Sequence, residues 1–319
     1  MSDIYDILII GGGPGGMTAG IYGSRARLKT AVLEKGRAGG QAATTMEMEN
    51  YPGFFRHTSG PGVMDEFKAH AEHFGTVFHK GVADKLDLIG EIKSVTTKTG
   101  ETYQARSIVL APGAEPRTLG IKGEGKLRGK GVSYCATCDA DFFEELDVVV
   151  VGNGDAAIEE AMYLTKFAES VTVIVIHDEG VLDCNKKSAE KALAHPKLRW
   201  VWNSVLDEVI GDELVEGVVV KNLKTGELSN LETNGVFVFI GTMPKTEFLQ
   251  GTITLDKWGY IPTNEKMETD IPGVYAVGDA RAKYLRQVIT AAADGAIAAC
   301  TAEKFLEGHV EGRFDPSKL

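Results

Sequence analysis

The chain contains the same pattern of strand, glycine loop, helix and strand twice. The first copy covers residues 5–34, and its loop reads Gly-Gly-Gly-Pro-Gly-Gly from Gly11 to Gly16. The second copy covers residues 148–176 and aligns with the first without a gap, so that Gly152 stands at the position of Gly11. An apolar strand that leads through a glycine-rich turn into a helix is typical of dinucleotide binding. The repeat therefore predicts an α/β fold with two related nucleotide-binding units.

The first loop has a residue for each task of dinucleotide binding. Gly11 would make the tight turn after the strand, Gly13 would let the backbone approach a pyrophosphate, and Gly16 would allow close packing of the helix. Glu34 ends the next strand, where an acidic side chain can accept ribose hydroxyls. A glycine-rich loop without a ligand is the alternative, and the complete context of the motif argues against it. We therefore predict a Rossmann-like dinucleotide site in residues 5–34.

The second copy lacks the ribose acid. At the constant offset Glu34 falls on Val175, and the residues that follow up to Glu179 offer no arginine for a 2′-phosphate. Asp178 lies shortly after that position, from which it could still reach a ribose. We expect the second site to bind NADH poorly or not at all.

Two cysteines form a CxxC motif. The spacing of Cys135 and Cys138 places both sulfurs on one side of a helical first turn, and the helix N-terminus lowers the thiol pKa. Half of a structural zinc site is the alternative, but it needs two further ligands at metal spacing. The other cysteines, Cys184 and Cys300, stand singly and are expected to be inert. The motif therefore predicts a redox dithiol and no metal site.

Composition and charge argue against several other classes of protein. The 319 residues suffice for about two domains, and 43% hydrophobic with 25% charged residues is ordinary for a soluble globular protein. A net charge of -11 without a basic stripe argues against nucleic acid binding. The sequence has no apolar run of the ~18 residues that a membrane-spanning helix needs, and its start reads as a strand rather than a signal peptide. Four cysteines, two of them in a redox motif, fit a reducing cytoplasm.

Further motifs extend over the whole chain. They are Gly-Gly-Gln at residues 39–41, Glu-Asn-Tyr-Pro-Gly-Phe at 49–54, Cys-Ala-Thr-Cys-Asp at 135–139, Gly-Asp at 278–279 and Arg-Gln at 286–287 before an expected terminal helix. With the first glycine loop, this combination resembles the low-molecular-weight thioredoxin reductases. The resemblance implies a glutathione-reductase-type α/β fold of two Rossmann-like nucleotide-binding domains, the second inserted in the first.

The resemblance also implies domain bounds, a cofactor and partners. Residues 1–115 and 243–319 would form a discontinuous FAD-binding domain. Residues 116–242 would form a pyridine-nucleotide-like domain that carries the CxxC disulfide. The cofactor would be FAD, the partner thioredoxin, and the protein a homodimer.

Single residues receive roles from the same resemblance. Cys138 would face the flavin, Cys135 would exchange with thioredoxin, and Asp139 would protonate the leaving thiolate. Capping a helix is the alternative role of Asp139. Asp279 would contact the ribityl or pyrophosphate region, and the flavin ring would be lined by Gly40, Gln41, Asn50, Arg286, Gln287 and Val288. The full set of implied FAD-binding residues is Gly11, Gly13, Pro14, Gly16, Glu34, Gly40, Gln41, Asn50, Ala111, Gly113, Gly278, Asp279, Arg286, Gln287 and Val288.

The insert departs from the pattern of this family. Members that use NADPH carry a His-Arg-Arg run and a further arginine, and the matching positions here are Val175, Ile176, His177 and Val181. The segment Ile-His-Asp-Glu-Gly-Val-Leu-Asp-Cys-Asn at residues 176–185 looks instead like the ferredoxin-dependent flavin thioredoxin reductases. We therefore expect electrons to pass from reduced ferredoxin through FAD and the Cys135–Cys138 disulfide to thioredoxin.

Other functions share parts of this pattern. An NADH-dependent thioredoxin or peroxiredoxin reductase would change only the donor. A redox-sensing flavoprotein would need no turnover, and a ferredoxin:NADP oxidoreductase would need no CxxC. An acidic ferredoxin would need a basic patch on this acidic chain. The candidates are Lys122, Lys126, Arg128 and Lys130, or Lys186, Lys187 and Lys191, although such runs are often only solvated faces.

Overall fold

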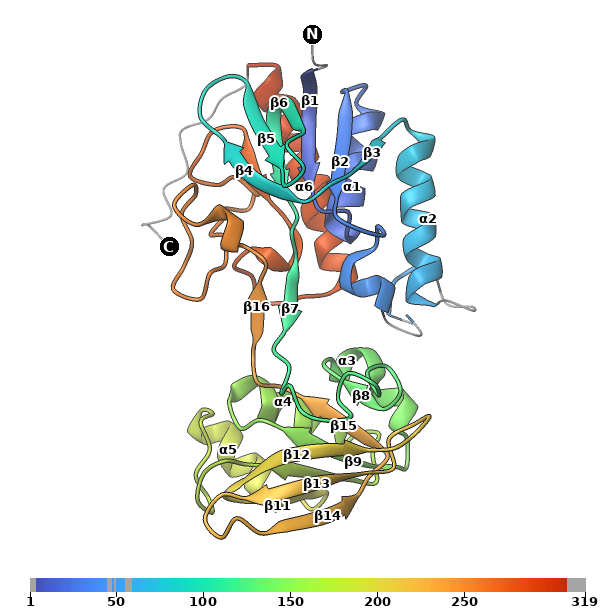
Figure 1. Ribbon diagram of the computed structural model, residues 1–319, viewed down its shortest axis with the longest axis vertical. Helices are drawn as coiled ribbons and strands as arrows, with labels where there is room; N and C mark the ends of the chain where they lie inside the picture. The colour runs from blue at the N-terminus through green and yellow to red at the C-terminus, as the bar shows by residue number, and fades with distance from the viewer. Residues whose placement is uncertain (1–3, 45–47, 49, 55–58, 309–319) are drawn as a thin grey trace. The chain divides into compact units, whose positions relative to one another are not determined.

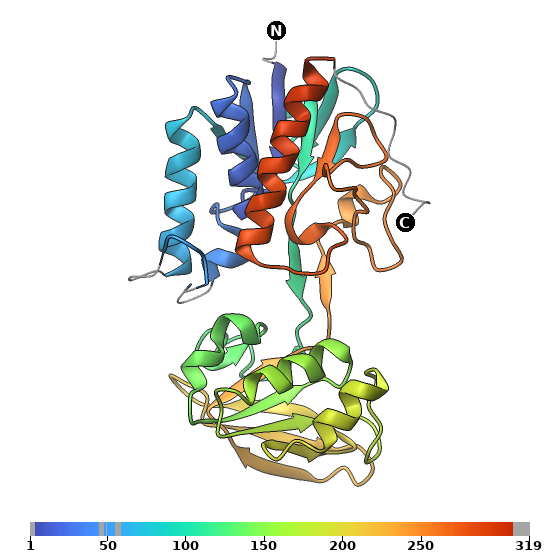
Figure 2. The ribbon, with the colours of Figure 1, turned by 180° about the vertical axis from the view of Figure 1, so that it is seen from behind.

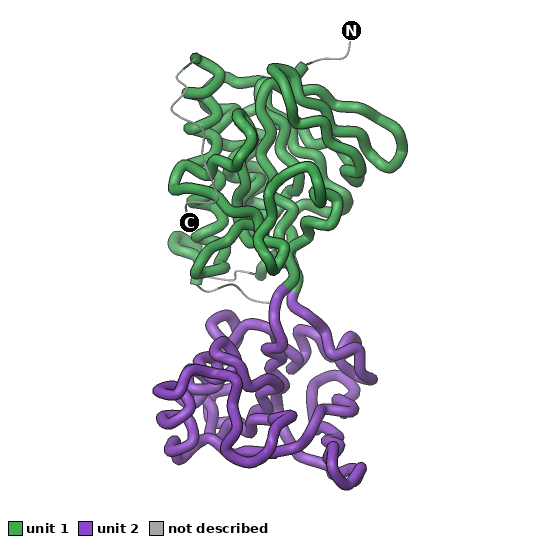
Figure 3. The backbone as a smooth tube through the Cα atoms, turned by 90° about the vertical axis from the view of Figure 1, so that its left-hand side faces the viewer, with its two compact units in different colours: residues 1–115, 243–319 green, residues 116–242 purple. Residues whose placement is uncertain are grey.

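The computed structural model describes residues 4–44, 48, 50–54 and 59–308, so that Glu49 of the 49–54 motif lies outside the described residues. The chain divides into two compact units (Figure 3). Unit 1 contains residues 1–115 and 243–319, and unit 2 is Pro116–Thr242. The chain passes between the units along β7 (Ala114–Pro116) and β16 (Thr242–Pro244), which pair as a two-stranded sheet.

Unit 1 is built on a seven-stranded sheet of order β3-β2-β1-β6-β5-β4, with β17 also paired to β6 (Figure 1). Its strands are β1 (Ile4–Ile10), β2 (Thr30–Glu34), β3 (Val77–Lys80), β4 (Ala83–Asp87), β5 (Lys93–Thr97), β6 (Thr102–Leu110) and β17 (Val274–Ala276). β1 pairs in parallel with β2 and β6, and β17 pairs in parallel with β6. The carboxyl ends of these strands therefore meet at one edge of the sheet, which is where α/β proteins bind ligands.

Three helices cover one face of this sheet (Figure 2). They are α1 (Pro14–Arg25), α2 (Gly60–His73) and α6 (Val288–Leu306), and the short 3-10 helices of the unit are η1 (Gly40–Thr44), η3 (Glu247–Leu249) and η4 (Gly278–Ala280). Alternation along β1 supplies both layers of core. Ile7 and Ile9 pack with α1 and α6, whereas Leu8 and Ile10 pack with the segment 249–280 on the other face.

Unit 2 repeats the plan with a parallel sheet of order β11-β10-β9-β15-β8. Its strands are β8 (Val132–Ser133), β9 (Asp147–Val151), β10 (Ser170–Ile174), β11 (Leu198–Val201) and β15 (Gly235–Val238), and its helices are α3 (Ala136–Asp139), η2 (Ala140–Phe143), α4 (Asp155–Leu164) and α5 (Lys186–Leu193). An antiparallel sheet of β12 (Ser204–Ile210), β13 (Gly217–Asn222) and β14 (Leu228–Glu232) packs on one face. Val148 and Val150 face α4, and Val149 and Val151 face the antiparallel sheet.

The predicted α/β fold with two Rossmann-like units is confirmed. The units β1–α1–β2 and β9–α4–β10 are the two copies of the sequence repeat. One strand bound is wrong: β10 ends at Ile174 and not at Ile176, because the chain turns away there and leaves Ile176 51% exposed. Among the described residues, the helices are all too short or too polar to cross a membrane.

Candidate dinucleotide and dithiol sites

The first glycine turn follows β1 and needs glycine at two points. Gly11 has φ +105°, and a Cβ atom there would collide with the carbonyl oxygen of Ala111. A Cβ atom on Gly16 would collide with the carbonyl oxygen of Gly11, so the start of α1 can lie against the turn only without a side chain. Pro14 begins α1, where its missing N–H has no cost.

The turn leaves an open backbone surface beside a second glycine. A Cβ atom on Gly13 would find only the Cα atom of Gly40, at 4.0 Å, within contact range. Gly40 itself has φ +60° and begins η1. Two backbone segments without side chains therefore face each other at the N-terminus of α1, which suits the close approach of an anionic group.

Glu34 lies where the repeat places it, at the end of β2. Its Oε2 accepts a hydrogen bond from the Gly12 N–H at 2.6 Å, and its Oε1 accepts one from the Gly36 N–H at 3.0 Å. The carboxylate is thereby held at the glycine turn. This position suits an acceptor of ribose hydroxyls.

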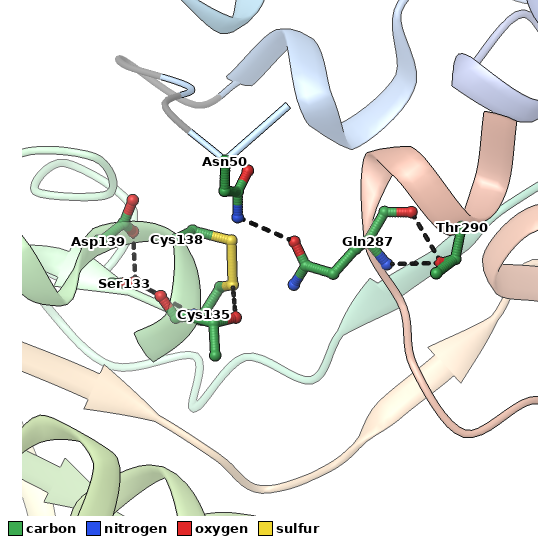
Figure 4. The surroundings of a disulfide bond; sticks show 8 residues. Asn50, Ser133, Cys135, Cys138, Asp139, Gln287 and Thr290 are labelled. Atoms are coloured by element: carbon green, nitrogen blue, oxygen red, sulfur yellow. Dashed lines mark hydrogen bonds between the residues drawn. A yellow bond between two sulfur atoms is a disulfide. The ribbon is translucent and has the colours of Figure 1, made fainter. Parts of the chain in front are cut away.

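The structure brings only some of the residues implied for the flavin ring into contact with one another. Asn50 Nδ2 donates to Gln287 Oε1 at 3.2 Å, and Gln287 forms a capping box with Thr290 at the start of α6 (Figure 4). Gln41 donates instead to Glu115 Oε1 at 3.3 Å. Of the other ring residues, Arg286 stacks over Tyr260 at 4.2 Å and Val288 is the first residue of α6. Gly113, a member of the wider FAD-binding set, follows β6 with φ +76°.

Asp279 supplies a buried acceptor without a partner. Its Oδ1 is buried and has no hydrogen-bond partner in the described part of the chain. Burial raises the pKa of this carboxyl group, while Lys283 and Arg286 lower it. A buried polar atom without a partner is costly. We therefore expect Asp279 Oδ1 to accept a hydrogen bond from a hydroxyl-rich ligand.

The neighbouring Asp294 is a site residue that the sequence analysis missed. It is 5% exposed, and its two oxygens accept hydrogen bonds from Arg281 Nη1 at 3.0 Å and Lys283 Nζ at 2.7 Å. Its Oδ2 also accepts from the Gly278 N–H at 3.0 Å, which fixes the turn that carries Asp279. An acid within the run of small and apolar residues that fills the first half of α6 is a signal that would have identified it.

The dithiol of unit 2 lies on the single helical turn α3. Cys135 is its N-cap residue and forms a disulfide with Cys138, with the two Cα atoms 5.3 Å apart (Figure 4). Both cysteines are half-buried. The disulfide is the structure expected of a CxxC redox couple.

Ser133 links the acid behind the disulfide to the first cysteine. Its Oγ donates to Asp139 Oδ2 at 2.5 Å and accepts from the Cys135 N–H at 3.1 Å (Figure 4). Burial raises the pKa of Asp139, the hydrogen bond from Ser133 lowers it, and Asp141 raises it. Asp139 makes no side-chain capping bond at η2, so its alternative role as a helix cap is not seen. Ser133 was not predicted as a site residue, because only the folded turn brings it to Asp139.

The second glycine turn repeats the backbone of the first. Gly152 has φ +130°, and a Cβ atom there would collide with the carbonyl oxygen of Phe239, as it would at Gly11 with Ala111. The two strands of each pair, β1 with β6 and β9 with β15, are parallel neighbours. The geometry of the turn is therefore preserved in unit 2.

The side chains around the second turn differ from those around the first. Asp183 donates its N–H to Asn153 O at 3.0 Å and accepts from Asn153 Nδ2 at 3.2 Å. Asp155 accepts from the Asn185 N–H at 2.8 Å. The segment after β10 thus lies against the turn and brings carboxylates to it.

Asp178, the late candidate for a ribose acid, is engaged elsewhere. It is exposed and forms an ion pair with Lys224, which lowers the pKa of its carboxyl group. Val175, which aligns with Glu34, is fully buried. Neither Val175 nor Asp178 therefore supplies a ribose acid in unit 2, and the carboxylate that contacts the second turn through Asn153 is that of Asp183.

Comparison with known proteins identifies the family. The family model for pyridine nucleotide-disulphide oxidoreductases matches residues 5–295. A thioredoxin reductase of Peptoclostridium acidaminophilum is 49% identical over 98% of this chain and 100% of its own length. The chain belongs to the low-molecular-weight thioredoxin reductases of this family.

Two solved structures of thioredoxin reductases align with nearly the whole chain. The enzyme from Streptococcus pyogenes has a TM-score of 0.92 and 41% identity, over 97% of this chain and 100% of that one. A ferredoxin-flavin thioredoxin reductase from Clostridium acetobutylicum has a TM-score of 0.52 and 30% identity, over 97% and 100%.

As a member of the thioredoxin reductases, the chain binds FAD and is a flavoprotein disulfide reductase. The residues of unit 1 fit this cofactor. The side-chain-free surface at Gly13 and Gly40 suits a pyrophosphate, and the buried oxygen of Asp279 suits a hydroxyl group. FAD supplies the exchange of electrons with the disulfide.

Proposed function

We propose that this chain is a thioredoxin reductase that receives its electrons from reduced ferredoxin. FAD would accept them, the Cys135–Cys138 disulfide would be reduced, and the dithiol would reduce thioredoxin. A flavin is needed because an iron-sulfur cluster gives one electron at a time and a disulfide takes two. A plant-type ferredoxin near about -400 mV and thioredoxin near about -270 mV make the transfer favourable by roughly 6 kcal/mol.

The chemistry at the second glycine turn carries this proposal. Residues 175–185 contain neither arginine nor lysine, and Asp155 and Asp183 bring negative charge to the turn. The phosphates of NADPH would meet the carboxylates of Asp155 and Asp183 there and no arginine. Each missing charge-assisted hydrogen bond forfeits about 1.5 to 3 kcal/mol.

We assign the FAD-binding roles to unit 1 as the family resemblance implies. Gly11, Gly13, Gly16 and Glu34 hold the adenosine half and the pyrophosphate, and Asp279 contacts the ribityl or pyrophosphate region. The flavin ring is assigned to Gly40, Gln41, Asn50, Arg286, Gln287 and Val288, and the remaining members of the set are Pro14, Ala111, Gly113 and Gly278. The 3.2 Å contact of Asn50 with Gln287 supports the ring assignment for those two residues.

The thiol chemistry follows from the CxxC turn. Cys135 as a thiolate attacks the thioredoxin disulfide and forms a mixed disulfide, and Cys138 then displaces the thioredoxin thiolate and restores the Cys135–Cys138 bond. Two electrons leave the dithiol in this exchange. Asp139 supplies a proton to the departing thiolate, and its raised pKa keeps that proton available.

Ferredoxin would dock on α5. Two members of the first candidate patch are neutralised, because Lys122 pairs with Glu208 at 2.6 Å and Lys126 with Asp212 at 2.7 Å. Lys186, Lys187 and Lys191 of α5 are exposed and make no ion pair among the described residues.

The resemblance further supports a homodimer and a cytoplasmic location.

Anaerobic mixing of the FAD-loaded protein with each donor tests the proposal. Reduced ferredoxin should bleach the flavin absorbance, and NADPH and NADH should do so more than about 100-fold more slowly, because about 3 kcal/mol of binding is missing. Equal or faster bleaching by NADH would identify a reductase that depends on NADH. Bleaching without any thioredoxin turnover would identify a redox sensor.

A further inference from the structure

The hydroxyl group of Ser133 lies within hydrogen-bond distance of three polar groups of the CxxC turn. Ser133 ends β8, is 6% exposed, and is paired with Phe237 of β15. Its Oγ is 2.5 Å from Asp139 Oδ2 and 3.3 Å from Cys135 O, and it accepts from the Cys135 N–H at 3.1 Å (Figure 4). A buried hydroxyl group therefore joins the acid behind the disulfide to the backbone of the first cysteine.

This arrangement lets the hydroxyl group bond to Asp139 in both charge states of the acid. A hydroxyl group has one proton to donate and two lone pairs that accept. When Asp139 is ionised, Ser133 donates to its carboxylate. When Asp139 is protonated, its O–H can donate to Ser133 Oγ, and the Ser133 proton can turn to Cys135 O. The bond to the carboxylate is the stronger of the two, because it is charge-assisted.

We propose that Ser133 is a positioning residue that orients the Asp139 carboxyl group for its proton transfer and stabilises the carboxylate that the transfer leaves behind. In this step the O–H bond of Asp139 breaks, an S–H bond forms on the departing thioredoxin thiolate, and the negative charge moves from sulfur to the carboxylate. The Ser133 proton turns from Cys135 O to Asp139 Oδ2 as that charge arrives. The inference rests on the proton-donor role of Asp139 in the proposed function and is independent of the electron donor.

Loss of the hydroxyl group should make Asp139 a weaker acid. Burial raises the pKa of Asp139, and the hydrogen bond from Ser133 acts in the opposite direction. Without that bond the carboxylate is less stable, so the pKa should rise further. The other charged or titratable groups on the elements packed around the turn stay the same when Ser133 is replaced. They are Asp141 on η2, Asp147 on β9, Glu159 and Glu160 on α4, Tyr134 with its partners Glu124 and Arg128, and Cys135 and Cys138 of the disulfide.

The pKa of Asp139 in Ser133→Ala tests the proposal. The oxidised, FAD-loaded protein is labelled with carbon-13 at its aspartate carboxyl groups, and the NMR resonance that disappears in Asp139→Asn is followed as the pH is raised. We expect the pKa of Asp139 to lie about 1 above its value in the wild type, because a hydrogen bond to a charged group is lost. An unchanged or lower pKa would overturn the proposal.

Ser204→Ala is the matched control, since Ser204 is also buried in unit 2 but donates to a backbone carbonyl group, that of Trp202, at 2.8 Å. It should leave the pKa of Asp139 unchanged. Ser133→Thr keeps the hydroxyl group and should restore the wild-type value. An equal rise in Ser204→Ala, or the alanine value in Ser133→Thr, would show that the hydroxyl group of Ser133 is not the cause and would also reject the proposal.

Thioredoxin turnover separates this inference from the proposed function. In Ser133→Ala the maximal rate should fall about tenfold, and the loss of activity at alkaline pH should move to higher pH together with the Asp139 pKa. Reduction of the flavin by its donor should not change. A raised NMR pKa without this movement would reject Asp139 as the proton donor and the inference with it, whereas an unchanged NMR pKa rejects the inference alone.

Discussion

Asp139 shows how one residue obtains its chemistry from its neighbours. Its carboxyl group is held by Ser133 at 2.5 Å, and burial raises its pKa. A carboxyl group with a raised pKa keeps its proton to a higher pH than an exposed aspartate does. This property suits a proton donor for a leaving thiolate. It also predicts that thioredoxin reduction is lost at alkaline pH, where Asp139 has given up its proton.

Asp139→Asn should slow thioredoxin reduction about 100-fold and leave the reduction of the flavin by its donor intact. The amide can still accept from Ser133 Oγ, so the turn is preserved, but it has no acidic proton. Steady-state turnover as a function of pH is the measurement. In the wild type the rate should fall as the pH rises through the Asp139 pKa, and in the variant this dependence should disappear.

Asp141→Asn provides the comparison for this prediction, because Asp141 is exposed and lies two positions further along. Its maximal turnover should stay close to that of the wild type, and its rate should begin to fall at a slightly lower pH, because Asp141 raises the pKa of Asp139. Equal losses of flavin reduction and thioredoxin reduction in Asp139→Asn would remove the acid from its assigned step.

At the scale of the element, the two glycine turns have similar backbone geometry but differ in where a Cβ atom fits. A Cβ atom on Gly16 collides with the backbone of Gly11, whereas the open positions are Gly13 and the residue that aligns with it, Gly154, where a Cβ atom meets nothing within 4 Å. Ala157, which aligns with Gly16, shows that unit 2 already accepts a side chain at that position.

Gly16→Ala should lower the stability of unit 1 by about 1 to 3 kcal/mol, because the start of α1 must move away from β1. The purified variant should also retain less FAD. Thermal unfolding and the ratio of flavin to protein absorbance measure both effects. Gly154→Ala is the paired substitution and should change neither quantity. A normal flavin content in Gly16→Ala would show that α1 does not need this close approach.

The elements that the sequence predicted are those whose signal is local. The glycine turns, Glu34 and the CxxC depend on spacing within one strand, turn and helix, and the structure places each where its spacing indicates. Ser133 and Asp294 were missed, since each acts through a contact made only after folding. The end of β10 was misplaced because the apolar run continues into Val175 and Ile176, although the chain leaves the sheet there.

At the scale of the whole molecule, the net charge of -11 makes docking of an acidic partner depend on a local surface. The three lysines of α5 are such a surface. Attraction between exposed charges accelerates association and weakens with salt, since the screening length is about 8 Å at physiological ionic strength.

Replacing Lys186, Lys187 and Lys191 together by alanine should lower the second-order rate of flavin reduction by ferredoxin about tenfold at low salt. The difference from the wild type should shrink as salt is added. Stopped-flow mixing at several ionic strengths gives both quantities. Lys122→Ala with Lys126→Ala is the control, because those side chains are already paired with acids. An equal effect in the control pair would place docking elsewhere.

The pairing of β7 with β16 bears on how such a chain could arise. The segment between them enters and leaves side by side, as neighbouring strands. A segment whose ends are adjacent can be gained or lost by a gene in one event without pulling the host sheet apart. Joining residue 115 to residue 243 by a short turn would leave every strand of the host sheet in its order. The nested repeat is therefore consistent with duplication of one ancestral nucleotide-binding unit, in which one copy was inserted into a loop of the other.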